Sequence, residues 1–240
     1  SKLGVIGNIA YYWCLIECIQ NAGVPVAGMA MSAVPVLVAA VSNIRDKKKG
    51  TALAWSRLVP GLLLIACGFA LASMTEFEMV VRASADGGVK FWYGVMMGVA
   101  ALLLWTWYPI RNADWLLAHP GRSPRAWSTA QGLTTFPFAV VMYLFFWELE
   151  PDGTPLLGYD PMWFVFVMVF TGLMGSWVGI VFWNAMSQRL PTALAGQMIV
   201  FETIFAVTYA HVLRMQWPAW NMLAGMALLL AGVTLSLKVF

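Results

Sequence analysis

Apolar segments of about 20 residues recur along this chain, and they limit the folds that it can adopt. A helix rises 1.5 Å per residue, so about 20 apolar residues are needed to cross the roughly 30 Å hydrocarbon core of a bilayer. The segments expected to span a membrane as helices are 3–20, 23–44, 53–74, 91–110, 126–147, 161–187, 192–213 and 217–240. Of the 240 residues, 61% are hydrophobic and only 10% are charged, against about 45–50% and about 25% in soluble domains. The sequence therefore predicts an all-α membrane protein that has the lipid bilayer as its main partner.

The basic residues predict how these helices are oriented. Alternate loops and ends on one side hold 11 of the 14 Lys and Arg residues: Lys2, Arg45, Lys47, Lys48, Lys49, Arg57, Arg111, Arg122, Arg125, Arg189 and Lys238. The opposite side holds the other three, which are Arg82, Lys90 and Arg214. It also holds most of the loop acids, namely Glu76, Glu78, Asp86, Glu148, Glu150, Asp152 and Asp160. Cytoplasmic loops carry an excess of Lys and Arg, so we expect both ends of this chain in the cytoplasm.

An internal repeat is predicted from the similarity of the last three segments to the first three. Residues 25–41 (PVAGMAMSAVPVLVAAV) align with residues 192–208 (TALAGQMIVFETIFAVT) at a shift of 167 positions. This alignment sets Pro35 opposite Glu202. A second match pairs glycines at equal spacing, Gly61 and Gly68 with Gly225 and Gly232, at a shift of 164 positions.

The repeat also predicts how the chain is organised. Segments 91–110 and 126–147 have no upstream partners, so two complete five-helix repeats would need two more helices before Ser1. The visible helices would then be eight of ten, in three parts: helices three to five of the first repeat (1–74), an outer connecting loop (75–90) and the complete second repeat (91–240). Because five is odd, the two repeats would be inverted, which is typical of secondary transporters.

Several of these residues resemble the motifs of EamA-type proteins in the drug/metabolite transporter superfamily. The matching residues are Trp183, Asn184 and Arg189, the carboxylate Glu202, Pro35, Gly225 and Gly232, and WTWY at 105–108. Two features depart from the pattern: Thr203 stands where the family has a proline after the glutamate, and SNIRD (42–46) and LRMQW (213–217) replace a Gly-Glu pair. The resemblance implies an exporter of small metabolites, such as amino acids, in a bacterial cytoplasmic (inner) membrane.

Glu202 is the main candidate for a functional carboxylate, because it lies near the middle of an apolar segment. It is the tenth residue after Thr192, about 15 Å along a helix. A charge at this depth costs about 3 kcal/mol on insertion scales, so such residues usually face the interior of a helix bundle. Glu202 would either bind a substrate amine or carry a coupling proton, or else hold the two halves together as a buried, hydrogen-bonded glutamate. Tyr209 is expected on the same helix face.

Aromatic residues supply further candidates for binding. Trp13 and Glu17 share a helix face and would suit a cationic or zwitterionic aromatic ligand, although Glu17 is also explained as a wet residue near the outer interface. Trp105 and Tyr108, three residues apart, share another face and would line a cavity or simply pack. An aromatic interior with few charges favours amphipathic organic solutes, such as amino acids or aromatic metabolites, over inorganic ions or sugar phosphates.

Small residues and a proline are expected to have structural roles. Gly28, Gly61, Gly68, Gly225 and Gly232 would allow helices to approach closely. Pro35 would kink its helix and act as a hinge. Asn184 would cap or cross-link helices.

The sequence favours a secondary transporter over two other classes. A membrane-embedded enzyme would need a polar catalytic cluster, and the sequence shows no intramembrane His/Asp pair, Ser-Lys pair or metal triad. A non-transporting scaffold or receptor remains the alternative, which residue spacing does not exclude. No metal site or cofactor is expected, because Cys14 and Cys18 lack further ligands and the two histidines, His119 and His211, lie near other segment ends. The net charge of +3 does not suggest nucleic acid. A small-molecule substrate is the expected partner, with protons as a candidate coupling ion, and the chain is compatible with a monomer or a homodimer.

Overall fold

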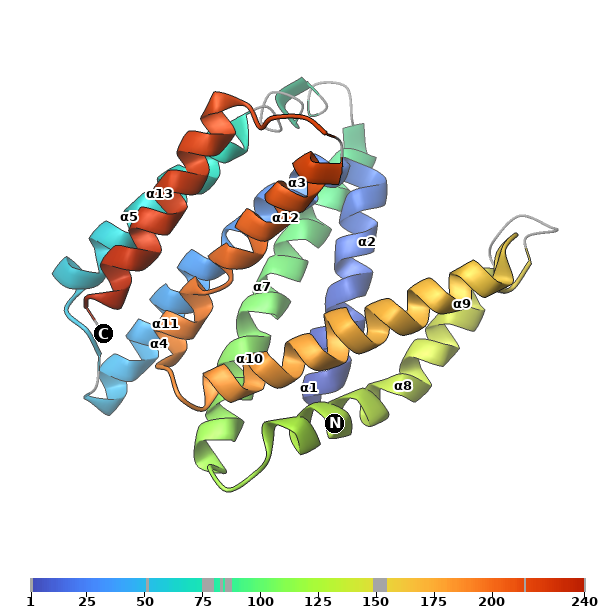
Figure 1. The fold of residues 1–240 in the computed structure, drawn as a ribbon, viewed down its shortest axis with the longest axis horizontal. Helices are drawn as coiled ribbons and strands as arrows, with labels where there is room; N and C mark the ends of the chain where they lie inside the picture. Colours follow the sequence, from blue (N-terminus) through green and yellow to red (C-terminus); the bar gives the residue numbers. More distant parts are fainter. Residues whose placement is uncertain are drawn as a thin grey trace. The chain divides into compact units, whose positions relative to one another are not determined.

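The protein is helical throughout the residues that the structure describes. The computed structural model describes residues 2–50, 52–74, 80–82, 84, 88–148, 155–213 and 215–239, without the side chains of 48, 49, 146–148 and 210. The helices, labelled as in Figure 1, are α1 (Lys2–Gly4), the π-helix η1 (Val5–Ala10), α2 (Tyr11–Ala22), α3 (Val24–Ser32), α4 (Val34–Lys49), α5 (Trp55–Ala72), α7 (Gly88–Ala118), α8 (Pro124–Glu148), α9 (Pro161–Phe170), the π-helix η2 (Thr171–Val178), α10 (Gly179–Ser187), α11 (Thr192–Gln197), α12 (Val200–Leu213) and α13 (Trp220–Leu237). No strand occurs among these residues, so the predicted all-α class is confirmed.

Seven helical stretches of the described chain are long and apolar enough to cross a membrane. They are Lys2–Ala22, Val24–Lys47, Trp55–Ala72, Gly88–Ala118, Pro161–Ser187, Thr192–Leu213 and Trp220–Leu237. Each overlaps one of the segments predicted from the sequence. The remaining segment, 126–147, forms α8 but is not among the seven, and the first half of α8 carries the buried polar residues Ser128, Gln131 and Thr135.

Part of the loop between α5 and α7 lies outside the described residues. The predicted outer loop, 75–90, is described at 80–82, 84 and 88–90, and α7 already begins at Gly88. Several loop residues that predicted the orientation also lie outside the described residues: Glu76, Glu78, Asp86, Glu150, Asp152 and Arg214.

The helices form two compact units. Unit 1 consists of Ser1–Ala10 and Arg111–Arg189, and unit 2 consists of Tyr11–Ile110 and Leu190–Phe240. Each unit therefore combines a piece of the first part of the chain with a piece of the second.

In unit 2, α5 and α13 lie side by side along their length (Figure 1). Four glycines bring their backbones together. A Cβ atom on Gly68 would lie 2.8 Å from the carbonyl oxygen of Gly225, and a Cβ on Gly225 would lie 2.7 Å from the carbonyl oxygen of Gly68. The other pair is equally close, since a Cβ on Gly232 would lie 2.8 Å from the carbonyl oxygen of Gly61. Any side chain at these positions would push the two helices apart.

Two membrane-spanning stretches of unit 2 are broken near their middle. The first breaks at Ala33, between α3 and α4. Pro35 lies in the first turn of α4, and because it has no N–H it cannot donate the backbone bond that would continue α3 into α4. The second breaks between α11 and α12, where the amides of Ile199 and Glu202 bond to carbonyls only three residues back. On one side of these breaks α4 packs along α11, with Ala39 against Ala193.

Unit 1 is held together by a buried network of amide side chains. Asn112 of α7 donates to the side-chain oxygen of Asn184 of α10 at 2.7 Å, and Asn184 donates to the hydroxyl of Ser128 of α8 at 2.8 Å. The Asn112 oxygen in turn accepts from Gln131 at 2.9 Å and from the indole of Trp127 at 2.8 Å. Asn184 thus links three helices, which is a role that polar residues have between membrane helices.

The π-helices of unit 1 occur at related positions in the chain. Adding the shift of 167 positions from the sequence alignment to η1 (5–10) gives 172–177, which lies within η2 (171–178). The same shift carries Ala33, at the first helix break, to Val200, which directly follows the second break. Both the π-helices and the helix breaks therefore occur at positions that the sequence alignment pairs.

Candidate functional site

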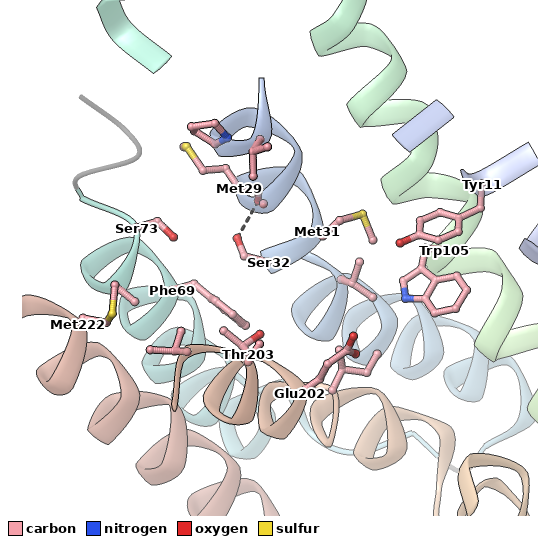
Figure 2. A pocket seen from close by; sticks show the side chains of 18 of the residues that line it. Tyr11, Met29, Met31, Ser32, Phe69, Ser73, Trp105, Glu202, Thr203 and Met222 are labelled. Atoms are coloured by element: carbon pink, nitrogen blue, oxygen red, sulfur yellow. Dashed lines mark hydrogen bonds between the residues drawn. The ribbon is translucent and has the colours of Figure 1, made fainter. Parts of the chain in front are cut away.

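A pocket of about 680 Å³ lies within unit 2, with α3 on one side and α12 on the other (Figure 2). Side chains from α2, α7 and the facing ends of α5 and α13 complete its wall. Its volume is within the range of about 300–1,000 Å³ that is usual for small-molecule sites. The helix breaks border it directly, because Val34 and Ile199 both line it. The pocket is therefore placed where two broken helices face each other.

Glu202 is the one charged side chain among the described residues that line the pocket. It lies in the first turn of α12, where the helix dipole favours a negative charge. Figure 2 shows its carboxylate pointing from α12 into the pocket. Among the described residues no group donates a hydrogen bond to it, and Tyr11 and Tyr12 of α2 line the same pocket. The carboxylate is thus available to a ligand.

Aromatic rings stack in a column at one side of the pocket. Tyr11 of α2 stacks on Trp105 of α7 with ring centroids 4.5 Å apart, and Trp105 stacks on Tyr108 at 5.4 Å. Tyr11 and Trp105 line the pocket, whereas Tyr108 is buried behind them. Of the aromatic pair predicted for a cavity, one residue lines it and the other supports that residue from behind.

Methionines and hydroxyl groups make up much of the remaining wall. Met29 and Met31 come from α3 and Met222 from α13, and Phe69 of α5 lies on the same side of the pocket as Met222 (Figure 2). The hydroxyl of Ser32 donates to the carbonyl oxygen of Met29 at 2.7 Å. Thr203 and Ser73 add two more hydroxyls to the lining. The site is mainly apolar and adaptable, with a few polar groups and one charge.

Three predicted binding residues do not line the pocket. Trp13 and Glu17 follow Tyr11 by two and six residues, so around the axis of α2 they point about 160° and 120° away from the direction of Tyr11. The Glu17 carboxylate instead accepts a hydrogen bond from Asn21 at 3.2 Å. Tyr209 is exposed and stacks on Phe205, and of the α12 residues predicted on the face of Glu202 only Ala206 lines the pocket, together with Thr203 and Val207.

Gly28 also differs from its predicted role. A Cβ atom on Gly28 would have no neighbour within 4 Å, so this glycine does not bring two helices into contact. It lines the pocket on α3 instead. The other four glycines of the predicted packing set lie at the α5–α13 contact, Pro35 is fully buried at the start of α4, and Asn184 belongs to the amide network of unit 1.

Sequence reasoning missed several lining residues, and the sequence carried a weak signal for some of them. Tyr11 and Tyr12 form a Tyr-Tyr pair inside an apolar segment, and Ser32 lies three residues before Pro35. Thr203 follows Glu202 directly. No such signal marked the three methionines or Phe69. Among the described residues no group of three His, Cys, Asp or Glu side chains gathers that could hold a metal ion.

Comparisons with known proteins place the chain among inner-membrane proteins. No family model matches it. It is 35% identical over 241 residues to the inner membrane protein YtfF of Escherichia coli (strain K12), a match that covers 98% of this chain and 74% of YtfF. A protein chain solved by crystallography has the same fold, with a TM-score of 0.75 over 99% of this chain and 75% of that chain, at 16% identity. The chain therefore belongs to the family of inner membrane protein YtfF and is an integral inner-membrane protein with several membrane-spanning helices.

Proposed function

We propose that this protein is a secondary transporter that exports small amphipathic organic metabolites through the pocket in unit 2. The observation that carries the proposal is the position of the pocket between two broken helices, with the intramembrane carboxylate Glu202 in its wall. Broken helices near the middle of the membrane form the substrate sites of many secondary transporters. A carboxylate at this depth is expected to serve a function unless it is paired, and Glu202 accepts no hydrogen bond from a described residue.

Two inverted five-helix repeats are part of this proposal. The matching positions of the π-helices, of the two helix breaks and of the paired glycines support the repeat. So does the resemblance to EamA-type proteins. We propose that eight helices of this chain belong to a ten-helix arrangement, with both ends of the chain in the cytoplasm.

The two sides of the broken helices support a mechanism of alternating access. In an inverted repeat, the contact of α4 with α11 is equivalent to that of α3 with α12. The first pair is packed together, whereas the second pair faces across the pocket. The orientation predicted from the basic residues puts α4 and α11 on the cytoplasmic side, so this conformation would be open to the outside. Closing α3 on α12 while α4 leaves α11 would expose the same pocket to the cytoplasm.

Solute counterflow tests the proposal. Purified full-length protein is reconstituted into liposomes loaded with an unlabelled panel of amino acids, aromatic amines and other amphipathic metabolites, and the uptake of each labelled solute is followed. We expect transient accumulation of at least one solute, absent from protein-free liposomes. If no member of the panel accumulates, the protein is not the proposed exporter.

Two other functions would give different results in the same experiment. A receptor or scaffold would bind a solute at the pocket without moving it. A membrane-embedded enzyme would convert it, and the described lining offers one carboxylate but no second carboxylate, His, Lys or Cys to form a catalytic pair with it. We therefore propose that the protein is not an enzyme.

A further inference from the structure

The charges that line the pocket restrict what it can bind. Its described lining contains one carboxylate, Glu202, and no Lys, Arg or His side chain. A solute with a negative charge would meet Glu202 without any opposite charge in the wall. A zwitterion would leave its own carboxylate unpaired there. Moving such a charge from water into a mainly apolar site without a partner is costly.

The helix end that could attract an anion is already used. Backbone amides at a helix N-terminus attract negative groups, and α12 begins at the pocket. Glu202 itself lies in that first turn, and its own amide bonds to the carbonyl oxygen of Ile199 at 3.0 Å. The amide of Phe201 also bonds to a carbonyl three residues back, that of Met198, so these two N–H groups are not free for an anionic ligand.

The rest of the wall suits the body of an organic cation. Trp105 and Tyr11 present stacked rings, and a cation within about 6 Å of an aromatic face is attracted to it. Met29, Met31 and Met222 offer flexible, polarizable surface that adapts to apolar groups of different shape. Tyr12 adds a further ring to the lining.

We propose that the pocket takes organic monocations: solutes with one ammonium group on an aromatic or aliphatic body. The ammonium group would lie between the Glu202 carboxylate and the Tyr11–Trp105 rings, and the body would lie against Phe69 and the methionines. This inference rests on the proposed function because it names the solute class for the same site. It separates amines from amino acids, which the proposed function alone does not.

Four ligands of similar shape and different charge test the inference. They are 2-phenylethylamine (cation), phenylalanine (zwitterion), 3-phenylpropionate (anion) and 2-phenylethanol (neutral). Their affinities for the purified full-length protein in detergent are measured by isothermal titration calorimetry at neutral pH. We expect the amine to bind at least tenfold more tightly than each of the other three. Equal or tighter binding of any other ligand, or binding of none, overturns the proposal.

Variants show whether Glu202 is responsible for the preference. In Glu202→Gln the amine should lose its tenfold advantage over 2-phenylethanol, whereas Glu202→Asp, which keeps the charge, should retain part of it. Glu17→Gln is the matched control: Glu17 is also a carboxylate in a membrane-spanning helix but does not line the pocket, so this variant should keep the preference. A preference that survives in Glu202→Gln, or disappears in Glu17→Gln, contradicts the assignment to this pocket.

Transport of the same four ligands separates this inference from the proposed function. If the amine binds selectively but none of the four shows counterflow, the site for cations stands and the transport function is what fails. If phenylalanine or 3-phenylpropionate is carried and the amine is not, the transport function stands and the cation site is wrong.

Discussion

An ionised carboxylate in an apolar segment costs about 3 kcal/mol to insert on translocon scales, so a chain that carries one must place it away from lipid. Glu202 meets this requirement by pointing into the pocket from the first turn of α12 (Figure 2). The sequence indicated the residue and its depth, but it left open whether Glu202 meets a ligand or a neighbouring helix. The absence of a hydrogen-bond donor among the described residues favours the ligand.

The charge of Glu202 predicts how amine binding depends on pH. The other titratable side chains in the described lining are Tyr11 and Tyr12, and tyrosines titrate near pH 10 in model peptides. As the pH is lowered through the range in which a carboxyl group takes up a proton, the charge of Glu202 is lost and the affinity for 2-phenylethylamine should fall. In Glu202→Gln, the affinity measured by calorimetry from pH 8 to pH 5 should be flat. A wild-type affinity that does not change with pH would exclude Glu202 as the proton-sensitive group.

The aromatic column predicts a second effect on binding. Trp105→Leu removes the ring that stacks on Tyr11 and lines the pocket, so the amine should bind roughly 2- to 30-fold more weakly, since a cation–π contact is worth about 0.5–2 kcal/mol. Trp107→Leu is the control, because Trp107 lies on the same helix but does not line the pocket. If the two variants bind the amine equally well, the column has no part in recognition.

At the scale of elements, the contact between α5 and α13 should be the least tolerant of added side chains. In Gly68→Val the new Cβ would meet the backbone of α13 at 2.8 Å, and neither helix can yield without losing other contacts. We expect a loss of about 1–3 kcal/mol in the free energy of unfolding, the usual cost of overpacking. Thermal or denaturant unfolding in detergent measures it. Gly28→Val, at a position with no neighbour within 4 Å, should unfold like the wild type, and equal losses in both variants would contradict the packing.

The amide network of unit 1 predicts a loss of stability without a loss of binding. Asn184→Ala leaves the Nδ2 group of Asn112 without its buried acceptor, at a cost of about 1–3 kcal/mol, whereas the Ser128 hydroxyl keeps its bond to the carbonyl oxygen of Pro124. Asn8→Ala is the control, since Asn8 is half-buried and makes a single hydrogen bond of 3.4 Å to Thr135. In detergent, Asn184→Ala should have a clearly lower free energy of unfolding than Asn8→Ala. Amine binding by the folded fraction should not change in either variant. Equal stability would mean that the network contributes little.

The elements show how far the sequence could predict this fold. Long apolar runs predicted seven of the membrane-spanning stretches, because hydropathy and length follow directly from the needs of the bilayer. Pro35 predicted one helix break, because proline has no N–H to donate to a backbone hydrogen bond. The second break has no proline, since Thr203 stands in that place, and neither π-helix has a local signal. These irregularities depend on packing between distant helices, which periodicity along one helix does not contain.

The candidate site was predicted in part for the same reason. Glu202 and Trp105 were found because charge and aromatic size stand out in an apolar segment. Trp13, Glu17 and Tyr209 stand out equally, but they do not line the pocket. The side of a helix that faces a cavity depends on where its neighbours lie, and a break changes that side within one turn, as it does between α11 and α12.

At the scale of the whole molecule, the helix contacts of unit 2 are of two kinds. One pair of helices is packed along its length, and the two broken helices are packed on one side of their breaks only. The glycines of α5 and α13 hold those helices together, whereas the broken helices meet on one side through α4 and α11 and leave the pocket on the other. A transporter needs both features, because rigid parts must move around a site that opens to one side at a time.

If solutes cross the membrane through this pocket, as we propose, a bulky side chain placed in the pocket should block them. Gly28→Trp adds an indole where a Cβ has no neighbour within 4 Å, so the variant should fold while its side chain fills the pocket. Gly132→Trp is the matched control, because Gly132 on α8 is equally open but lies outside the pocket. The measurement is counterflow of the best solute of the panel in liposomes that contain equal amounts of folded protein. We predict that Gly28→Trp abolishes accumulation and Gly132→Trp keeps it, whereas wild-type accumulation by Gly28→Trp would contradict the account.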